Sequence, residues 1–337
     1  MTKIILEPGL TTTREQIAQT FGGSKYSGGI VPAKASGMVF VFSDPAAGAK
    51  HGYTFDGQAD DDEYGTLYMY TGAGGEGDQD LVRGNKVLHD TLRNGREVHL
   101  FVADGRVAGS ATVLQRYVGQ VVVDPIQPFV ERRAPDQQGE LRRVLVFRLR
   151  AAQGQNLLLT EKDAMQPATK TTVLDMEPAA KLGVLPAQVG VTEKNTEQHV
   201  TGETTANVAG GIRRVMRREG VLVKAFEEHL AQAGHSFKSF QITVAGEPGV
   251  LTPDLYDQTD HVLYEAKGQA SRNNVRMAIG QLADYRRHIP GENTLRTAVL
   301  LPDEPTPDVK DLLAARNIAL IYQTEDGFSG FPLQSSG

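Results

Sequence analysis

The stretch Pro253–Gly268, PDLYDQTDHVLYEAKG, places an aspartate after a proline and then a short apolar run that contains Glu-Ala-Lys. The apolar run has the composition of a β-strand, in which alternate side chains point to the same face. Glu265 and Lys267 are two residues apart and are therefore expected to project together. This pattern suits a divalent-metal site, but it also suits an ordinary exposed ion pair, so the surrounding sequence has to discriminate between the two.

The segments around this stretch predict an α/β unit over residues 209–330. Apolar residues recur at helical spacing between Ile212 and Leu230, and Gly234 closes this predicted helix. The following segments predict a strand over 239–246, the strand of the opening stretch, a helix over 273–289, a strand over 297–303, a helix over 308–317 and a strand over 318–324. This order predicts a compact αβββαβ core.

Residues 38–150 predict a different, mostly β architecture. Short segments rich in Val, Phe and Tyr are separated by Gly, Asp and Pro, which is typical of strands joined by turns. They are MVFVFSD (38–44), TLYMYTG (66–72), REVHLFVADG (96–105), YVGQVVVD (117–124) and RRVLVFRL (142–149). One helix is expected around Gln79–Leu92. The pattern favours a barrel-like sheet with a flanking helix, as part of a domain over residues 1–150.

Residues 151–208 are polar and rich in threonine, with prolines and weak periodicity. A connection of this length suits a boundary between domains better than a loop inside one. We therefore expect a linker over 151–208, with at most one short helix, between domains at 1–150 and 209–330. The chain is thus predicted to be multidomain, with an α+β part followed by an α/β part.

The composition is that of a globular protein: 337 residues, 40% hydrophobic and 23% charged. No run approaches the roughly 18 apolar residues of a membrane span, and the N-terminus lacks the features of a signal peptide. The absence of cysteine excludes disulfides, thiolate zinc sites and cysteine nucleophiles. A cytoplasmic protein that does not bind membranes is the simplest expectation.

The formal net charge of −6 does not by itself indicate nucleic-acid binding. Binding depends on local basic patches rather than on the total charge. Such patches occur at residues 141–150, 212–218 and 284–288, although each is equally compatible with a solvated face.

Motif and element order in the C-terminal region resemble the PD-(D/E)xK nuclease family, whose motif stands here as Pro253-Asp254 and Glu265-Ala266-Lys267. The resemblance implies a restriction-endonuclease-like core in which Asp254, Glu265 and Ala266 form the metal site. Carboxylate oxygens suit Mg²⁺, with Mn²⁺ as a substitute. Lys267 would then orient or stabilise the attacking nucleophile and offset phosphate charge.

Two further residues are candidates for this catalytic site. Gln281 lies on the helix after the motif, one turn from Tyr285, and resembles a glutamine that family members often use to hold the site together. The alternative is a polar residue on the flank of a helix. Glu219 is the candidate acid on the preceding helix, although Glu227 or Glu228 could serve instead, or none of them.

Other catalytic classes have weaker support in the sequence. The histidines are scattered, and neither a G-x-S-x-G nor a P-loop pattern occurs. Gly72-x-Gly74-x-x-Gly77 matches a dinucleotide-binding fingerprint formally and would indicate an oxidoreductase. However, acidic residues follow where a pyrophosphate would bind, and the later segments continue as β-strands rather than as βαβ units.

The same glycines belong to a pattern that resembles the SRA (SET and RING associated) domain, a PUA-like β-barrel with flanking helices. The resemblance covers roughly residues 35–150. It rests on GYTFD (52–56), YTGAGG (70–75), GDQ (77–79), GN (84–85) and YVG (117–119). The segment GQADDDEYGT (57–66) is longer than in typical members, and YVG replaces the Tyr-Asp-Gly of eukaryotic members. SRA domains bind methylated or hydroxymethylated cytosine in DNA.

A flipped base needs flat faces for stacking and hydrogen-bond partners for its edge. Tyr53 and Tyr70 are the expected stacking partners, and Asp56 is the expected acceptor for the cytosine N4 amine. Thr71 and backbone N–H groups of the loop at Gly72 are expected to bind the remaining edge. For each tyrosine the alternative is a packed strand-face aromatic.

Together the two resemblances imply a modification-dependent (type IV-like) restriction endonuclease with a role in phage defence. It would flip and read 5-methylcytosine or 5-hydroxymethylcytosine in double-stranded DNA and hydrolyse phosphodiester bonds nearby with Mg²⁺. A homodimer is expected, because one catalytic domain holds one active site and a duplex has two strands. The first alternative is a modified-DNA-binding protein with an inactive or partner-dependent nuclease domain, and the second is the oxidoreductase.

Overall fold

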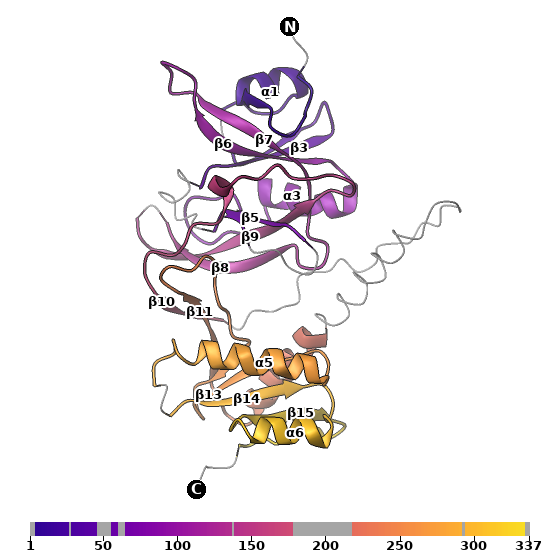
Figure 1. Cartoon of the computed structure of the whole chain (residues 1–337), viewed down its shortest axis with the longest axis vertical. Coiled ribbons are helices and arrows are strands. Elements are labelled where there is room, and N and C mark those ends of the chain that lie inside the picture. Colours follow the sequence, from indigo (N-terminus) through magenta and orange to yellow (C-terminus); the bar gives the residue numbers. More distant parts are fainter. Residues whose placement is uncertain are drawn as a thin grey trace, which may run out of the picture. The chain divides into compact units, whose positions relative to one another are not determined.

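The computed structural model describes residues 4–26, 28–45, 55–59, 65–136, 138–177, 218–291 and 294–333 (Figure 1). The chain forms two compact units. Unit 1 comprises Met1–Ala168 with Gly246–Gly249, and unit 2 comprises Thr169–Ala245 with Val250–Gly337. Each unit is built around its own sheet and its own hydrophobic core.

Unit 1 contains a nine-stranded sheet of mixed direction. Its path is β2-β3-β6-β7-β9-β5-β4, with β1 paired to β7 and β8 paired to β9. Only β3 and β6 pair in parallel. The strands are β1 (Thr11–Thr13), β2 (Ile30–Ala33), β3 (Met38–Ser43), β4 (Gly57–Gln58), β5 (Leu67–Thr71), β6 (Val98–Arg106), β7 (Val113–Val123), β8 (Phe129–Pro135) and β9 (Leu141–Ala151).

Two helices of unit 1 pack on this sheet. Helix α3 (Arg83–Asn94) buries Leu88 in the main core and ends at Gly95, whose φ of 65° is the left-handed conformation that favours glycine at a helix end. Helix α1 (Arg14–Phe21) begins with a capping box between Thr13 and Gln16. The five strands predicted from sequence are confirmed as β3, β5, β6, β7 and β9, and the predicted flanking helix as α3, which begins four residues later than expected.

Unit 2 contains a seven-stranded sheet in the order β10-β11-β12-β13-β14-β15-β16. The adjacent strands β13, β14 and β15 run parallel, and the other neighbours pair antiparallel. The strands are β10 (Thr172–Met176), β11 (Phe237–Thr243), β12 (Leu255–Asp257), β13 (Val262–Ala266), β14 (Arg296–Leu301), β15 (Ala319–Thr324) and β16 (Gly327–Ser329).

Helices cover both faces of this second sheet. The helix over residues 218–232 packs Phe226 and Leu230 against Tyr264 of β13. Helices α5 (Arg272–Tyr285) and α6 (Pro307–Ala314) belong to the other core, where Leu282 packs with Leu263 of β13. Alternate residues of β13 therefore serve opposite cores, as the two-residue period of a strand requires. The order from the helix over 218–232 to β15 agrees with the predicted αβββαβ succession.

The structure differs from the expected linker at residues 151–177. This part contains a short 3-10 helix (Glu161–Asp163) and β10, and β10 pairs along its whole length with β11. An edge strand pairs with only one neighbouring strand, so its sequence shows only weak alternation of apolar and polar residues and is polar in composition. Residues 178–217, which include the start of the predicted helix after the linker, lie outside the described residues. Among the described helices, none is long and apolar enough to cross a membrane.

Candidate base-binding and catalytic sites

Asp56 is held rigidly inside unit 1. Its Oδ1 accepts a 2.7 Å hydrogen bond from the backbone N–H of Thr71, and its Oδ2 accepts a 2.8 Å bond from Ser43 Oγ. The hydroxyl of Tyr68 in turn donates to Ser43 Oγ at 2.9 Å. Burial raises the pKa of Asp56 to about 6, although the hydrogen bonds from Thr71 and Ser43 act in the opposite direction. The structure thus places two predicted base-binding residues, Asp56 and Thr71, in direct contact.

Tyr70 lies two residues along β5 from Tyr68 and is buried in the main core of unit 1. Its hydroxyl is packed so tightly against Gly29 that a Cβ at this glycine would lie 2.1 Å from the hydroxyl oxygen. Tyr70 is thus packed in the core as a strand aromatic, which agrees with the alternative to a stacking role at a flipped base. The other predicted stacking residue, Tyr53, lies outside the described residues.

The glycine loop at residues 72–77 is fixed by three side chains to which the sequence assigned no role. Gln79 Nε2 donates to the carbonyls of Gly72 and Gly74 at 2.7 and 3.0 Å. Asn85 Oδ1 accepts from the N–H of Ala73 at 2.7 Å, and Arg142 Nη1 donates to the carbonyl of Gly74 at 2.9 Å. All three side chains are buried. Gln79 and Asn85 stand within the motif blocks of the sequence, so their pattern was visible, whereas Arg142 is distant in sequence and gave no signal.

The backbone geometry around the glycine loop argues against the dinucleotide-binding alternative. The N–H of Gly72 donates to the carbonyl of Leu145, and strand β5 is antiparallel to both β4 and β9. A dinucleotide fingerprint belongs to a βαβ unit with parallel strands. The loop is instead part of an antiparallel sheet whose backbone groups are already bonded.

Three of the predicted catalytic residues of unit 2 lie in or next to two adjacent strands: Asp254 directly precedes β12, Glu265 lies in β13, and Lys267 directly follows β13. The register Leu255↔Tyr264 between β12 and β13, continued by one residue, sets Asp254 opposite Glu265. Asp254 Oδ2 accepts a 2.7 Å hydrogen bond from the N–H of Ala266. Lys267 Nζ lies 2.7 Å from Glu265 Oε1. The side chains of Asp254, Glu265 and Lys267 are all buried, which contradicts the alternative of an ordinary exposed ion pair.

Glu219 contacts the end of the same strand region from the helix over 218–232. Its Oε1 accepts a 3.0 Å hydrogen bond from the N–H of Gly268, the residue after Lys267. Glu227 lies two turns further along this helix, and its burial raises its pKa to about 7. Glu228 is exposed. Of the three candidate acids, Glu219 is thus the one with a hydrogen bond to the Glu-Ala-Lys segment in the described residues.

Gln281 lies on α5, and its Nε2 donates a 3.3 Å hydrogen bond to the hydroxyl of Tyr285, one turn away. Its Oε1 is buried and accepts no hydrogen bond from the part of the chain that the structure describes. No described hydrogen bond joins Gln281 to Asp254, Glu265 or Lys267. The structure therefore brings together four of the five predicted catalytic residues and leaves Gln281 paired within its own helix.

The donor set around Glu265 suits the metal that the sequence predicts. Asp254 and Glu265 offer hard carboxylate oxygens, the ligand type that Mg²⁺ prefers. A carboxylate oxygen that accepts one hydrogen bond keeps a further lone pair for a cation. The residues present therefore fit Mg²⁺ chemically.

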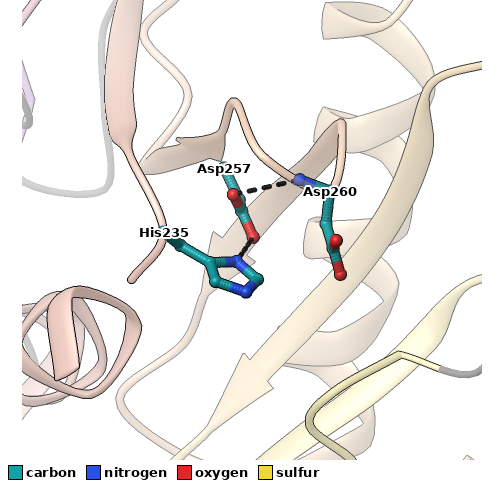
Figure 2. Close-up of side chains that lie close together, drawn as sticks. All are labelled: His235, Asp257 and Asp260. Carbon is teal, nitrogen blue, oxygen red and sulfur yellow. Dashed lines mark hydrogen bonds and ion pairs between the residues drawn. The ribbon is translucent and has the colours of Figure 1, made fainter. Parts of the chain in front are cut away.

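A second group of possible metal ligands lies at the turn between β12 and β13 (Figure 2). His235, Asp257 and Asp260 offer ligand atoms within 4.8 Å of one another. Asp257 Oδ2 accepts from His235 Nδ1 at 2.7 Å, and Asp257 Oδ1 accepts from two backbone N–H groups of the turn. Asp260 Oδ2 lies 3.3 Å from Arg296 Nη2, with which it forms an ion pair. These groups are already engaged by protein partners, so the cluster fixes the turn that positions β13.

Comparison with known proteins places an SRA domain in the N-terminal part of the chain. Residues 9–159 match the family model described as the SRA domain of ScoMcrA-like proteins. A search of curated proteins gave no match. The family match extends the sequence-based resemblance, which began near residue 35, toward the N-terminus to include α1 and β2.

Several solved structures are similar to part of the chain. One is the sulfur-binding and SRA domains of ScoMcrA complexed with phosphorothioated DNA, with 23% identity over 43% of this chain and 39% of that chain, at a TM-score of 0.32. ScoMcrA itself, a type IV phosphorothioation-dependent restriction endonuclease, matches over 24% of its length with the same identity and TM-score. The SRA domain of SUVH5 with fully methylated CG DNA matches over 47% of this chain and 97% of that chain, at 21% identity and a TM-score of 0.32.

Proposed function

We propose that this chain is a modification-dependent DNA endonuclease. The SRA domain flips 5-methylcytosine or 5-hydroxymethylcytosine out of duplex DNA, and unit 2 hydrolyses phosphodiester bonds nearby with Mg²⁺. The observation that carries the proposal is the juxtaposition of Asp254, Glu265 and Lys267 at the neighbouring ends of β12 and β13, in a chain whose residues 9–159 match an SRA-domain family model. Buried acids and a buried lysine at a strand end cost stability, so their presence favours a functional role.

The reading step follows from the fixed position of Asp56. Its carboxylate is oriented by the N–H of Thr71 and by Ser43, and each oxygen retains a lone pair for a further donor. The N4 amine of an extruded cytosine is such a donor. The rigid loop at residues 72–77 lies beside Thr71 and limits the shape of base that can enter. Asp56 therefore selects cytosine, and the loop selects its substituent.

In the proposed cleavage step the chain binds and orients the reacting groups. Asp254 and Glu265 would hold the Mg²⁺ ion, which, when bound, would supply an activated water and offset the charge of the phosphate. Lys267, held at 2.7 Å from Glu265, is positioned to stabilise the attacking hydroxide or the phosphate oxygens. Glu219 fixes the backbone at Gly268 and thereby holds Lys267 in place. A homodimer would supply the second active site that cutting both strands requires.

A modified-DNA-binding protein with an inactive or partner-dependent unit 2 is the second candidate function. The ion pair of Lys267 with Glu265 favours it, because the ammonium group and a metal cation would share the same carboxylate. Digestion of methylated, hydroxymethylated and unmodified plasmid in Mg²⁺ separates the two. Selective cutting of modified plasmid supports the endonuclease, whereas selective retention without cutting supports the binding protein. Equal cutting of all three plasmids overturns the reading role.

A further inference from the structure

A cavity of about 390 Å³ lies between α5 and α6 in unit 2, apart from the residues discussed so far. Three of the nine residues that line it are arginines and none is acidic, in a chain whose net charge is −6. The lining residues are Arg276, Ile279, Leu282, Ala283, Arg286, Thr297, Leu312, Arg316 and Ile318. The size lies within the range of small-molecule sites in proteins.

The cavity is on the opposite flank of α5 from the candidate catalytic glutamine. Arg276 and Arg286 are ten residues apart, which on a helix with 3.6 residues per turn sets their directions roughly 80° apart, and both line the cavity. Gln281 is five residues from each of them and points roughly 140° away from both. The cavity is thus a separate site, and a role for it does not depend on catalysis at Glu265.

Two arginines of the cavity carry uncompensated charge. The side chains of Arg276 and Arg316 are exposed and make no ion pair or hydrogen bond with the described residues. Their neighbours differ: Arg272 pairs with Asp308, and Arg287 pairs with Asp284. Asp308 of α6 and Asp284 of α5 therefore form ion pairs with arginines that do not line the cavity.

The floor of the cavity is apolar. Leu282, Leu312 and Ile318 contribute aliphatic surface between the two helices, and the buried residue Thr297 of β14 adds a hydroxyl group. An inorganic anion would leave this surface uncovered. A ligand that matches both parts has a phosphate for the guanidinium groups and a flat, weakly polar ring for the floor.

We propose that this cavity is a nucleotide-binding site that takes a nucleoside 5′-monophosphate. The guanidinium groups of Arg276, Arg286 and Arg316 bind the phosphate, and the base lies over Leu282, Leu312 and Ile318. A phosphate with an attached base can also come from a DNA strand. The volume of about 390 Å³ and the apolar floor fit one nucleotide, so the free nucleotide is the ligand assigned here.

The test is a fluorescence-polarisation titration of the full chain with a ribose-labelled fluorescent adenosine 5′-monophosphate, in EDTA so that no divalent metal takes part. We expect saturable binding that unlabelled nucleotide and, more weakly, inorganic phosphate displace. The variant carrying Arg276→Glu and Arg316→Glu should weaken binding at least tenfold. Both positions are exposed, and circular dichroism verifies folding.

Arg287→Glu is the matched control, because Arg287 is an exposed arginine next to Arg286 that does not line the cavity. It should bind as the unchanged chain does. Binding that is absent at millimolar nucleotide, or lost equally in Arg287→Glu, overturns the proposal. If a single-stranded dodecanucleotide binds through the same two arginines and the nucleotide does not, the phosphate belongs to DNA and the assignment to a free nucleotide is wrong.

Discussion

Lys267 Nζ lies 2.7 Å from Glu265 Oε1, and both side chains are buried at the end of β13. Two charges removed from water stabilise each other only as a pair, because each alone carries a large desolvation cost. The pair is therefore both a structural unit and, in the proposed function, the centre of the chemistry. Substitutions here separate these two roles.

Replacing Lys267 with alanine should abolish Mg²⁺-dependent cleavage and lower the free energy of unfolding by about 3–5 kcal/mol, since Glu265 is left as an uncompensated buried charge. Adding Glu265→Gln to Lys267→Met should recover much of the stability and none of the cleavage. Urea denaturation followed by circular dichroism measures the first quantity. Lys238→Ala is the control: Lys238 pairs with the exposed Asp175, and its loss should cost less than about 1 kcal/mol. Cleavage by a folded Lys267→Met variant would remove Lys267 from the mechanism.

Replacing Gly72 with alanine should weaken the preference for modified DNA. A Cβ at Gly72 would lie 2.8 Å from Asn85 Oδ1 and 3.1 Å from Gln79 Oε1, the side chains that fix the loop beside Thr71. Gly75→Ala in the same loop is the matched control, since a Cβ there meets nothing within 4 Å. We expect at least a tenfold loss in the ratio of methylated to unmethylated duplex affinity for Gly72→Ala and little change for Gly75→Ala. Similar losses in both variants would contradict a specific role for the bracing side chains.

The affinity for an extruded cytosine should depend on pH through Asp56, whose pKa burial raises to about 6. An ionised carboxylate accepts a stronger hydrogen bond from the N4 amine than a protonated one. The ratio of wild-type to Asp56→Asn affinity for the methylated duplex should therefore rise as the pH increases from 5 to 7.5. Titrations of both proteins at each pH measure this ratio. A ratio that is flat across this range would argue against Asp56 as the acceptor.

The same shift has a consequence for stability. The pKa of Asp56 in the folded state lies above its ordinary value of 3.8, so the folded chain binds more protons than the unfolded chain between about pH 4 and pH 6. The contribution of Asp56 to the free energy of unfolding must therefore decrease as the pH rises through this window. The pH dependence of urea denaturation for wild type, minus that for Asp56→Asn, measures this contribution. A difference that increases with pH would contradict a raised pKa for Asp56.

The cluster at the turn between β12 and β13 should behave as a structural element. Asp257 is fully buried and bonds His235 and two backbone N–H groups, so Asp257→Ala should cost about 2–4 kcal/mol of stability. Adding Mn²⁺ or Zn²⁺ should change the midpoint temperature of thermal unfolding no more in the wild type than in His235→Ala. A metal-dependent shift that requires His235 would make this cluster a metal site.

The element order of unit 2 and the strands of unit 1 could be predicted because each segment carries its own periodicity. The sequence alone could not distinguish a buried Glu265–Lys267 pair from an exposed one. Two-residue spacing determines which face of a strand the side chains share, but not whether that face is buried. The same limit applies to Tyr70, whose contact with Gly29 joins residues far apart in the chain.

Two other features could not be predicted from the sequence, because they depend on contacts between distant parts of the chain. Strand β10 is an edge strand with polar composition, and its pairing with β11 depends on a partner more than sixty residues away. Arg142 braces the loop at Gly74 from a different strand, β9, and belongs to a basic run that reads as a solvated face. Contacts of this kind arise from the fold and leave no local pattern.

The most direct measurement of the central claim is the single-turnover cleavage rate in Mg²⁺ of two duplexes that differ only in the methyl groups on cytosine. The proposed function predicts cutting of the methylated duplex at least a hundredfold faster than of the unmethylated one, and no cutting by Lys267→Met. Equal rates for the two duplexes would contradict the reading role of the SRA domain. Tight binding of the methylated duplex without cleavage, in wild type and Lys267→Met alike, would contradict the nuclease.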